Sequence, residues 1–272
     1  MKSSKRRIKW NAYLITGSIL MGVCLIVVLV GVFWTPYDPT KMSASEKLQG
    51  LSVRHIMGTD NKGRDIFSRV MYGSRITLLI ASGTMIIGAG IGSVIGALAG
   101  YFGGFFDEIV MRIIDAMLAF PSILLSLIIV SLYRTGNIEV MIALGIAFIP
   151  SFARIVRSEV LRCRDTDYVR SARLQGVSNL RIIFWHIMPN IHGVLLSSIL
   201  IGFNNAVLAE AGLSYLGIGS QPPYDSLGSM LSSAQQYMLT NPACVIGPGF
   251  AIVWIVLGFS FLGEGIRMDK EN

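Results

Sequence analysis

Residues 76–100 read ITLLIASGTMIIGAGIGSVIGALAG, a run of apolar and small residues without a single charge. About 20 apolar residues in a helix cross the hydrocarbon core of a bilayer, so this run predicts a transmembrane helix. Gly88, Gly92, Gly96 and Gly100 recur at every fourth position and therefore lie along one face of that helix. Such a face lets another helix approach closely, either within this chain or in a partner subunit.

Five more charge-free blocks flank this one, and together they predict an all-α membrane protein with six transmembrane helices. The composition agrees, because only 14% of the 272 residues are charged, against about 25% in soluble domains. The other five predicted spans are residues 13–34, 116–133, 140–153, 191–209 and 243–263. The fourth is short, since its 14 residues rise only about 21 Å in a helix.

Basic residues set the predicted orientation. Lys2, Lys5, Arg6, Arg7 and Lys9 precede the first span, and seven arginines lie between residues 154 and 190. The positive-inside rule places both groups in the cytoplasm only if the fourth span is kept, so both termini are predicted to be cytoplasmic. We divide the chain into residues 1–75, comprising a basic tail, the first helix and an external loop, and a five-helix core at residues 76–266.

Several function classes are excluded by the residues present. The net charge of +7 comes from basic residues placed between apolar blocks, which argues for a lipid bilayer and against nucleic acid as the partner. The segment from Gly58 to Asp65 has the glycine spacing of a phosphate-binding loop but has Arg64 in place of the lysine. We therefore predict no ATP hydrolysis by this chain, and we expect no bound cofactor, no metal site and no catalytic residue.

Four polar side chains fall within or beside the predicted spans. Asp115 and Glu210 lie near span ends, so we interpret them as paired or snorkelling end charges, with a role in an ion or substrate pathway as the alternative. Asn204 and Asn205 lie deeper in the fifth span. They are candidates for the pathway or for hydrogen bonding between helices.

The loop at residues 165–190 predicts two short helices. Asp165 or Thr166 can cap a first helix that ends at Gly176, and Ser178 can cap a second that ends before Pro189. On the first helix the small residues Val169, Ala172 and Gly176 are expected to share a face, while Arg170 and Arg173 point away from it. A helix of this kind suits docking into a groove on another protein, with binding to anionic lipid as the alternative.

This loop resembles the EAA loop of ABC-importer permeases. YVRSARLQG at residues 168–176 and HIMP at residues 186–189 have its spacing, with Ala172, Gly176 and Pro189 at matching positions. Arg170 and Ser171 depart from the pattern, since they stand where a glutamate and the first alanine are usual. The resemblance implies that an ATPase-coupling helix is formed by Tyr168, Val169, Arg170, Ser171, Ala172 and Gly176, with Pro189 following it.

Four further stretches resemble the dipeptide, oligopeptide and nickel branch of these permeases: residues 55–65, residues 101–104, Asp115 with residues 119–121, and residues 210–217 with residues 221–223. The resemblance implies a multi-pass permease of the bacterial cytoplasmic membrane for di- or oligopeptides, with nickel or a metal chelate as the alternative solute. Its implied partners are a second permease, two cytoplasmic ATPases that hold ATP and Mg, and an extracytoplasmic solute-binding protein. An ion-coupled carrier and a non-transporting membrane scaffold are the competing functions.

Overall fold

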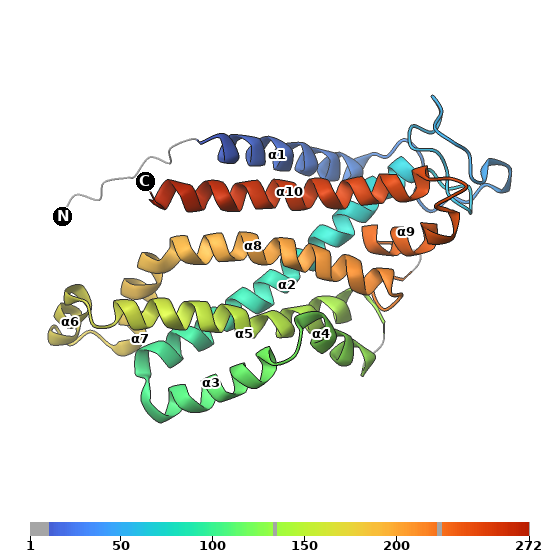
Figure 1. Ribbon diagram of the computed structural model, residues 1–272. Coiled ribbons are helices and arrows are strands. Elements are labelled where there is room, and N and C mark those ends of the chain that lie inside the picture. The colour runs from blue at the N-terminus through green and yellow to red at the C-terminus, as the bar shows by residue number, and fades with distance from the viewer. Residues whose placement is uncertain (1–10, 133–134, 222–224, 272) are drawn as a thin grey trace.

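The computed structural model describes residues 11–132, 135–221 and 225–271, and in these residues the regular structure is helical (Figure 1). The prediction of an all-α membrane protein is confirmed. Three parts of the sequence predictions lie outside the described residues: the basic run at residues 2–9, the end of the third span at Tyr133, and Pro222 and Pro223.

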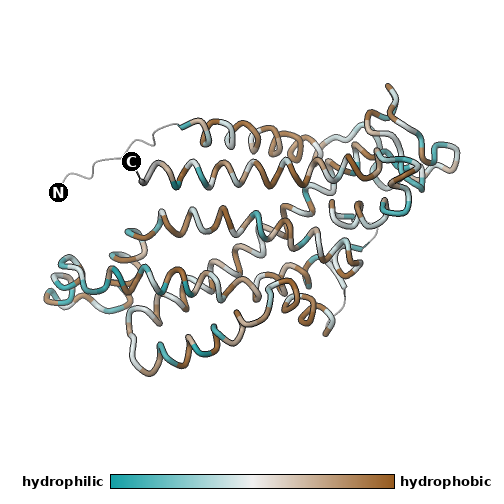
Figure 2. The backbone as a smooth tube through the Cα atoms, in the orientation of Figure 1, coloured by the Kyte–Doolittle hydropathy of each residue, from teal (hydrophilic) through white to brown (hydrophobic). Residues whose placement is uncertain are grey.

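Five helices are long and apolar enough to cross a membrane, and Figure 2 shows hydrophobic residues along most of their length. Four of them extend beyond the predicted spans, because a helix does not stop where its apolar stretch stops. Their bounds are α1 Ala12–Phe33, α2 Ile66–Phe102, α5 Asn137–Cys163, α8 Met188–Tyr215 and α10 Ala243–Glu271. The predicted domain boundary at residues 75 and 76 falls inside α2.

The predicted third span is not one straight helix. It is divided between α3 (Gly104–Leu118) and α4 (Ser122–Ser131), whose axes differ by 88°. Pro121 lies at the break with an extended ψ of 131°. Proline has no N–H to continue a helical ladder and disfavours helical backbone in the residue before it, so the chain turns here. The bent pair makes a sixth span only if its two helices are counted together.

The predicted fourth span was too short. Helix α5 has 27 residues and rises about 40 Å, which is enough to cross a bilayer. Its charged C-terminal half remains helical because α3 runs beside it with acidic residues. Arg157 contacts Asp107 through two hydrogen bonds of 2.5 and 2.6 Å, and Arg154 forms an ion pair with Asp115.

Helices α2 and α5 pack along each other at the centre of the bundle, with α8 and α10 beside them and α1 against α10 (Figure 1). The Asn11 side chain donates to the Gly265 carbonyl over 2.9 Å, which ties the start of α1 to the end of α10. The start of α1 and the end of α10 lie at the same end of the bundle as the short helix α6 (Asp167–Leu174). The loop at residues 34–65 and the short helix α9 (Leu227–Ala234) lie at the opposite end.

Candidate coupling helix and pathway residues

The first loop helix forms where it was predicted. Thr166 is the residue before α6, but its hydroxyl donates to the Cys163 carbonyl over 2.5 Å instead of capping the helix. At the other end Gly176 has a φ of +74°. The Gly176 N–H donates to the Arg173 carbonyl at 3.0 Å, and the Val177 N–H donates to the Ala172 carbonyl at 3.1 Å. This hydrogen-bond pair is a Schellman motif, which needs a left-handed residue and therefore favours glycine.

One face of α6 is buried and the other is open. Val169 and Ala172 pack against an apolar cluster that includes Ile183 and Ile187. Gly176 was expected on that face, but it is exposed and a Cβ atom on it would meet nothing within 4 Å. Its role is the turn, and the small face consists of Val169 and Ala172. The exposed face carries Tyr168, Arg170, Ser171 and Leu174.

Tyr101, near the end of α2, holds the loop that contains α6 through two hydrogen bonds. The Tyr101 hydroxyl donates to Asn179 Oδ1 over 3.0 Å and accepts a 3.2 Å hydrogen bond from Arg173 Nε. The Arg173 guanidinium also lies 4.9 Å from the centre of the Tyr101 ring, a cation–π distance. Arg164, at the C-cap of α5, donates to the Gly100 carbonyl over 3.2 Å. Sequence spacing could not identify Tyr101 as the link, because its partners are more than 70 residues away.

The second loop helix does not end before Pro189. Helix α7 (Asn179–Arg181) continues through a π-helical turn, Ile182–Ile187, into α8, so Pro189 lies in the first turn of a continuing helix. In this wider turn the Met188 N–H donates to the carbonyl of Ile183, five residues earlier. A π turn accommodates Pro189, because the ladder is already shifted where the proline has no N–H to donate.

The glycine face of α2 packs against α5 of the same chain. A Cβ atom on Gly92 would lie 2.6 Å from the Ile149 carbonyl oxygen, and one on Gly100 would lie 2.8 Å from that of Arg157. Gly88 and Gly96 face Phe148 and Ala153 in the same way. The two helices therefore approach more closely than any larger residue at these positions would allow.

The two acidic candidates are in different surroundings. Asp115 is exposed and paired with Arg154, as an end charge would be. Glu210 is fully buried, and the interpretation of it as a paired or snorkelling end charge is wrong. Its Oε1 atom accepts a 2.7 Å hydrogen bond from Ser214, and its Oε2 atom has no hydrogen-bond partner among the described residues. The burial arises because α9 packs against this end of α8, with Gly228 against the backbone of Ala211.

The two asparagines also differ. Asn204 is half-buried and faces α10. With its amide turned to satisfy both polar atoms, it donates to the Val256 carbonyl at 3.0 Å and accepts from the Ser260 N–H at 3.2 Å. Asn205 is exposed on α8, so it is the one free to line a pathway or to face a partner.

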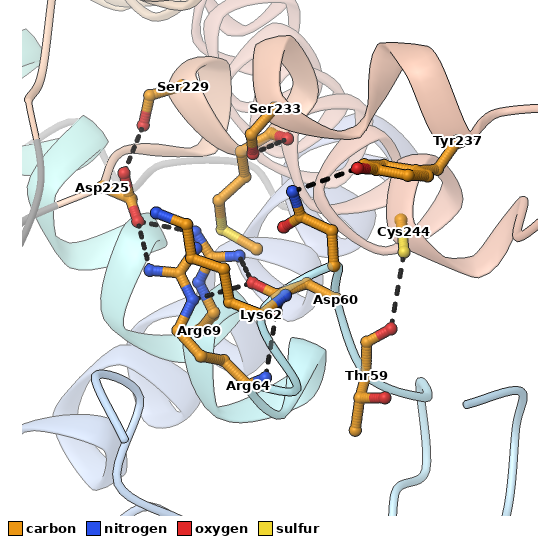
Figure 3. Close-up of polar contacts among 12 residues, drawn as sticks. Thr59, Asp60, Lys62, Arg64, Arg69, Asp225, Ser229, Ser233, Tyr237 and Cys244 are labelled. Carbon is orange, nitrogen blue, oxygen red and sulfur yellow. Dashed lines mark hydrogen bonds and ion pairs between the residues drawn. The ribbon is translucent and has the colours of Figure 1, made fainter. Parts of the chain in front are cut away.

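A cluster of four charges holds the opposite end of the bundle together (Figure 3). It consists of Asp60, Arg64, Arg69 and Asp225, and sequence analysis did not predict it. Arg69 donates to both aspartates at 2.6 Å, and Arg64 donates to them at 2.8 and 3.2 Å. Asp60 also accepts from the N–H groups of Lys62 and Arg64. These contacts explain the sequence from Gly58 to Asp65 as a structural turn.

Comparisons with known proteins agree with this architecture. The family model described as "Binding-protein-dependent transport system inner membrane component" matches residues 92–267. The dipeptide transport system permease protein DppC of Alkalihalophilus pseudofirmus is 37% identical over 96% of this chain and 86% of its own length. The glutathione transport system permease protein GsiD of Pectobacterium atrosepticum is 38% identical over 92% and 85%.

A solved structure of the MetNI methionine ABC transporter has the same fold. Its TM-score is 0.61 at 18% identity, over 75% of this chain and 95% of that one. The chain described here therefore belongs to the binding-protein-dependent transport system inner membrane components, the multi-pass permeases of ABC importers.

Proposed function

We propose that this chain is one permease of an importer for short peptides, including di- and tripeptides. The observation that carries this solute class is similarity along nearly the whole chain to permeases named for dipeptides and for glutathione, itself a tripeptide. The nickel alternative stays a prediction, and no observation favours it.

We further propose that α6 is the helix that an ATPase subunit grips. Its buried face holds it on the bundle, while Leu174 is 90% exposed and Tyr168 and Arg170 stand beside it. Tyrosine and arginine are enriched at protein–protein interfaces, so this exposed face favours a protein partner. Helix α6 continues from α5 and is linked to α2 through Tyr101, so a push on it would reach two long helices.

We also propose where the remaining partners bind. Since α6, the start of α1 and the end of α10 lie at one end of the bundle, we place that end in the cytoplasm, in agreement with the arginines of the loop. Two ATPases would bind there and would hold ATP and Mg. The solute-binding protein would meet the opposite end, and a second, different permease would complete the pathway beside the exposed Asn205.

Reconstitution tests the proposal. Proteoliposomes that contain both permeases, both ATPases and the solute-binding protein should take up a labelled dipeptide only with ATP. Uptake by this chain without ATPases would contradict the proposal and favour an ion-coupled carrier.

The docking helix has its own test. Arg170→Glu should reduce co-purification of the ATPases, whereas Arg181→Glu, an exposed arginine of the same loop outside α6, should not. Equal yields for both variants and the wild type would refute docking through α6.

A further inference from the structure

An apolar groove runs between α1, α2 and α10, at a distance from the proposed coupling helix. Its inner part is a cavity of about 180 Å³ lined by Cys24 and Val28 of α1, Val70 of α2, and Phe250 and Trp254 of α10. The Trp254 Nε1–H donates to the Leu20 carbonyl over 2.9 Å, which fixes the indole ring between α1 and α10. The groove is therefore a formed feature of the packing between three helices.

The groove continues toward the end of the bundle that bears the four-charge cluster. A second cavity of about 550 Å³ lies between the loop around Leu51 and Ile56 and the start of α10. Met57, Gly247 and Phe250 line both cavities, so the two adjoin each other. Apart from Ser74, Thr240 and Asn241, the residues that line the two cavities are apolar or glycine, which suits a hydrocarbon chain.

The depth of the groove places it against lipid. Helix α1 has 22 residues without a charge and rises about 33 Å, close to the thickness of a hydrocarbon core. Cys24 and Val28 lie in its middle and C-terminal half, so the inner cavity is at hydrocarbon depth. Leu25 and Leu29 of α1 are 50% and 59% exposed, and Val253 of α10 is 54% exposed. These neighbouring side chains are apolar and about half of each is left uncovered by the described chain, as on lipid-facing surfaces.

Water would be poorly held in this groove. Ser74 is the one hydroxyl residue among those lining the inner cavity, whereas an ordered water needs two to four polar partners. The loop at the mouth agrees with an apolar occupant, because Leu51 and Ile56 are 74% and 61% exposed there. Side chains of this kind at a membrane-facing mouth favour contact with acyl chains.

We propose that the groove binds one acyl chain of a membrane phospholipid, which enters between the loop at residues 48–57 and α10 and lies against α1. The chain would fill the gap between α1 and the helices behind it. Most of this site belongs to α1, to the loop and to the first turns of α2, which precede the residues matched by the family model.

Trp254 provides the test, because bromine atoms on an acyl chain quench indole fluorescence on close contact. The assembled transporter would carry phenylalanine in place of Trp10, Trp34 and Trp185 of this chain. It would be studied in nanodiscs of phosphatidylcholine with or without dibrominated acyl chains. Subtraction of the same complex with Trp254→Phe isolates the signal. We expect Trp254 emission to be lower in the brominated nanodiscs.

A matched pair of variants separates the groove from ordinary surrounding lipid. Val28→Phe fills the groove and should restore most of the lost emission. Val30→Phe changes the same residue type on the same helix at a position that is 41% exposed and outside the groove, and should restore none. Equal quenching in both variants, or no quenching of Trp254 at all, would overturn the proposal. If Val28→Phe fails to fold, Ala251→Phe fills the same cavity from α10.

Discussion

The link between α6 and α2 makes the sharpest prediction. Tyr101→Phe removes one hydroxyl group and keeps the buried ring, so the contact between the ring and Arg173 remains. What is lost is the pair of hydrogen bonds to Asn179 and Arg173, at 3.0 and 3.2 Å. The substitution therefore weakens the connection of α2 to the loop that contains α6 and α7, without opening a cavity of any size.

The expected magnitude follows from these two bonds. A neutral hydrogen bond contributes about 0.5–1.5 kcal/mol net, and a bond to a charged group contributes about 1.5–3 kcal/mol. Because Arg173 is exposed, its bond belongs at or below the lower end of that range. Together they amount to about 1–2 kcal/mol, which corresponds to a shift of roughly 5–30-fold between the fastened and the loosened state.

The assay is the number of peptides imported per ATP hydrolysed in proteoliposomes of the complete transporter. We expect Tyr101→Phe to lower this ratio several-fold while ATP hydrolysis continues, because under the proposed docking the ATPases would still grip α6 but would move α2 less. Tyr215→Phe is the matched control, since Tyr215 is exposed at the far end of α8. A wild-type ratio for Tyr101→Phe would refute the idea that this hydroxyl transmits the movement.

Three other predictions concern the stability of the bundle, each measured as the unfolding temperature of the purified protein. Gly92→Leu should destabilise the protein by at least about 1–3 kcal/mol through overpacking against α5, whereas Gly90→Leu should cost about 1 kcal/mol or less, because a Cβ atom on Gly90 would meet nothing within 4 Å. Equal losses of stability would contradict the close approach of the two helices. Asp225→Asn should cost about 3–5 kcal/mol of stability, because it leaves two buried arginines facing one aspartate, while the control Glu108→Gln breaks an exposed ion pair and should cost under about 1 kcal/mol. A small loss of stability in Asp225→Asn would show that the cluster is not stabilising. Arg157→Met should cost about 2–3 kcal/mol of stability by leaving Asp107 without its two short hydrogen bonds, and the double variant with Asp107→Asn should lose less stability than the two single variants added together. Fully additive losses would show that the two side chains do not interact.

Much of the fold could be predicted from the sequence because it depends on local patterns. Apolar blocks identify the helices that cross a membrane, since a backbone in lipid must satisfy its own hydrogen bonds. The Schellman turn at Gly176 was likewise predictable from one residue type in one position. Errors arose where contacts override local pattern. The bend at Pro121 fell within an apolar block, and α5 continues past its apolar stretch because acidic residues on α3 pair with its arginines.

The candidate site shows the same division. The motif at residues 168–176 and 186–189 was visible in the sequence, and so was the buried face of Val169 and Ala172. The contacts of Tyr101 with Asn179 and of Asp225 with the two arginines of the four-charge cluster were not predicted, because they join residues that are far apart along the chain. No spacing rule describes such pairs.

The sequence by itself determined that this chain lies in a membrane as a bundle of helices, because hydropathy and helical period are properties of consecutive residues. Only the tertiary structure decided which faces of those helices pack together. It showed that the glycine face of α2 packs against α5 and that Glu210 is buried, not exposed at an end. It also revealed the apolar groove beside α1. The physical reason is that burial, ion pairing and cavities depend on which surfaces meet, and that is settled when all the helices pack together.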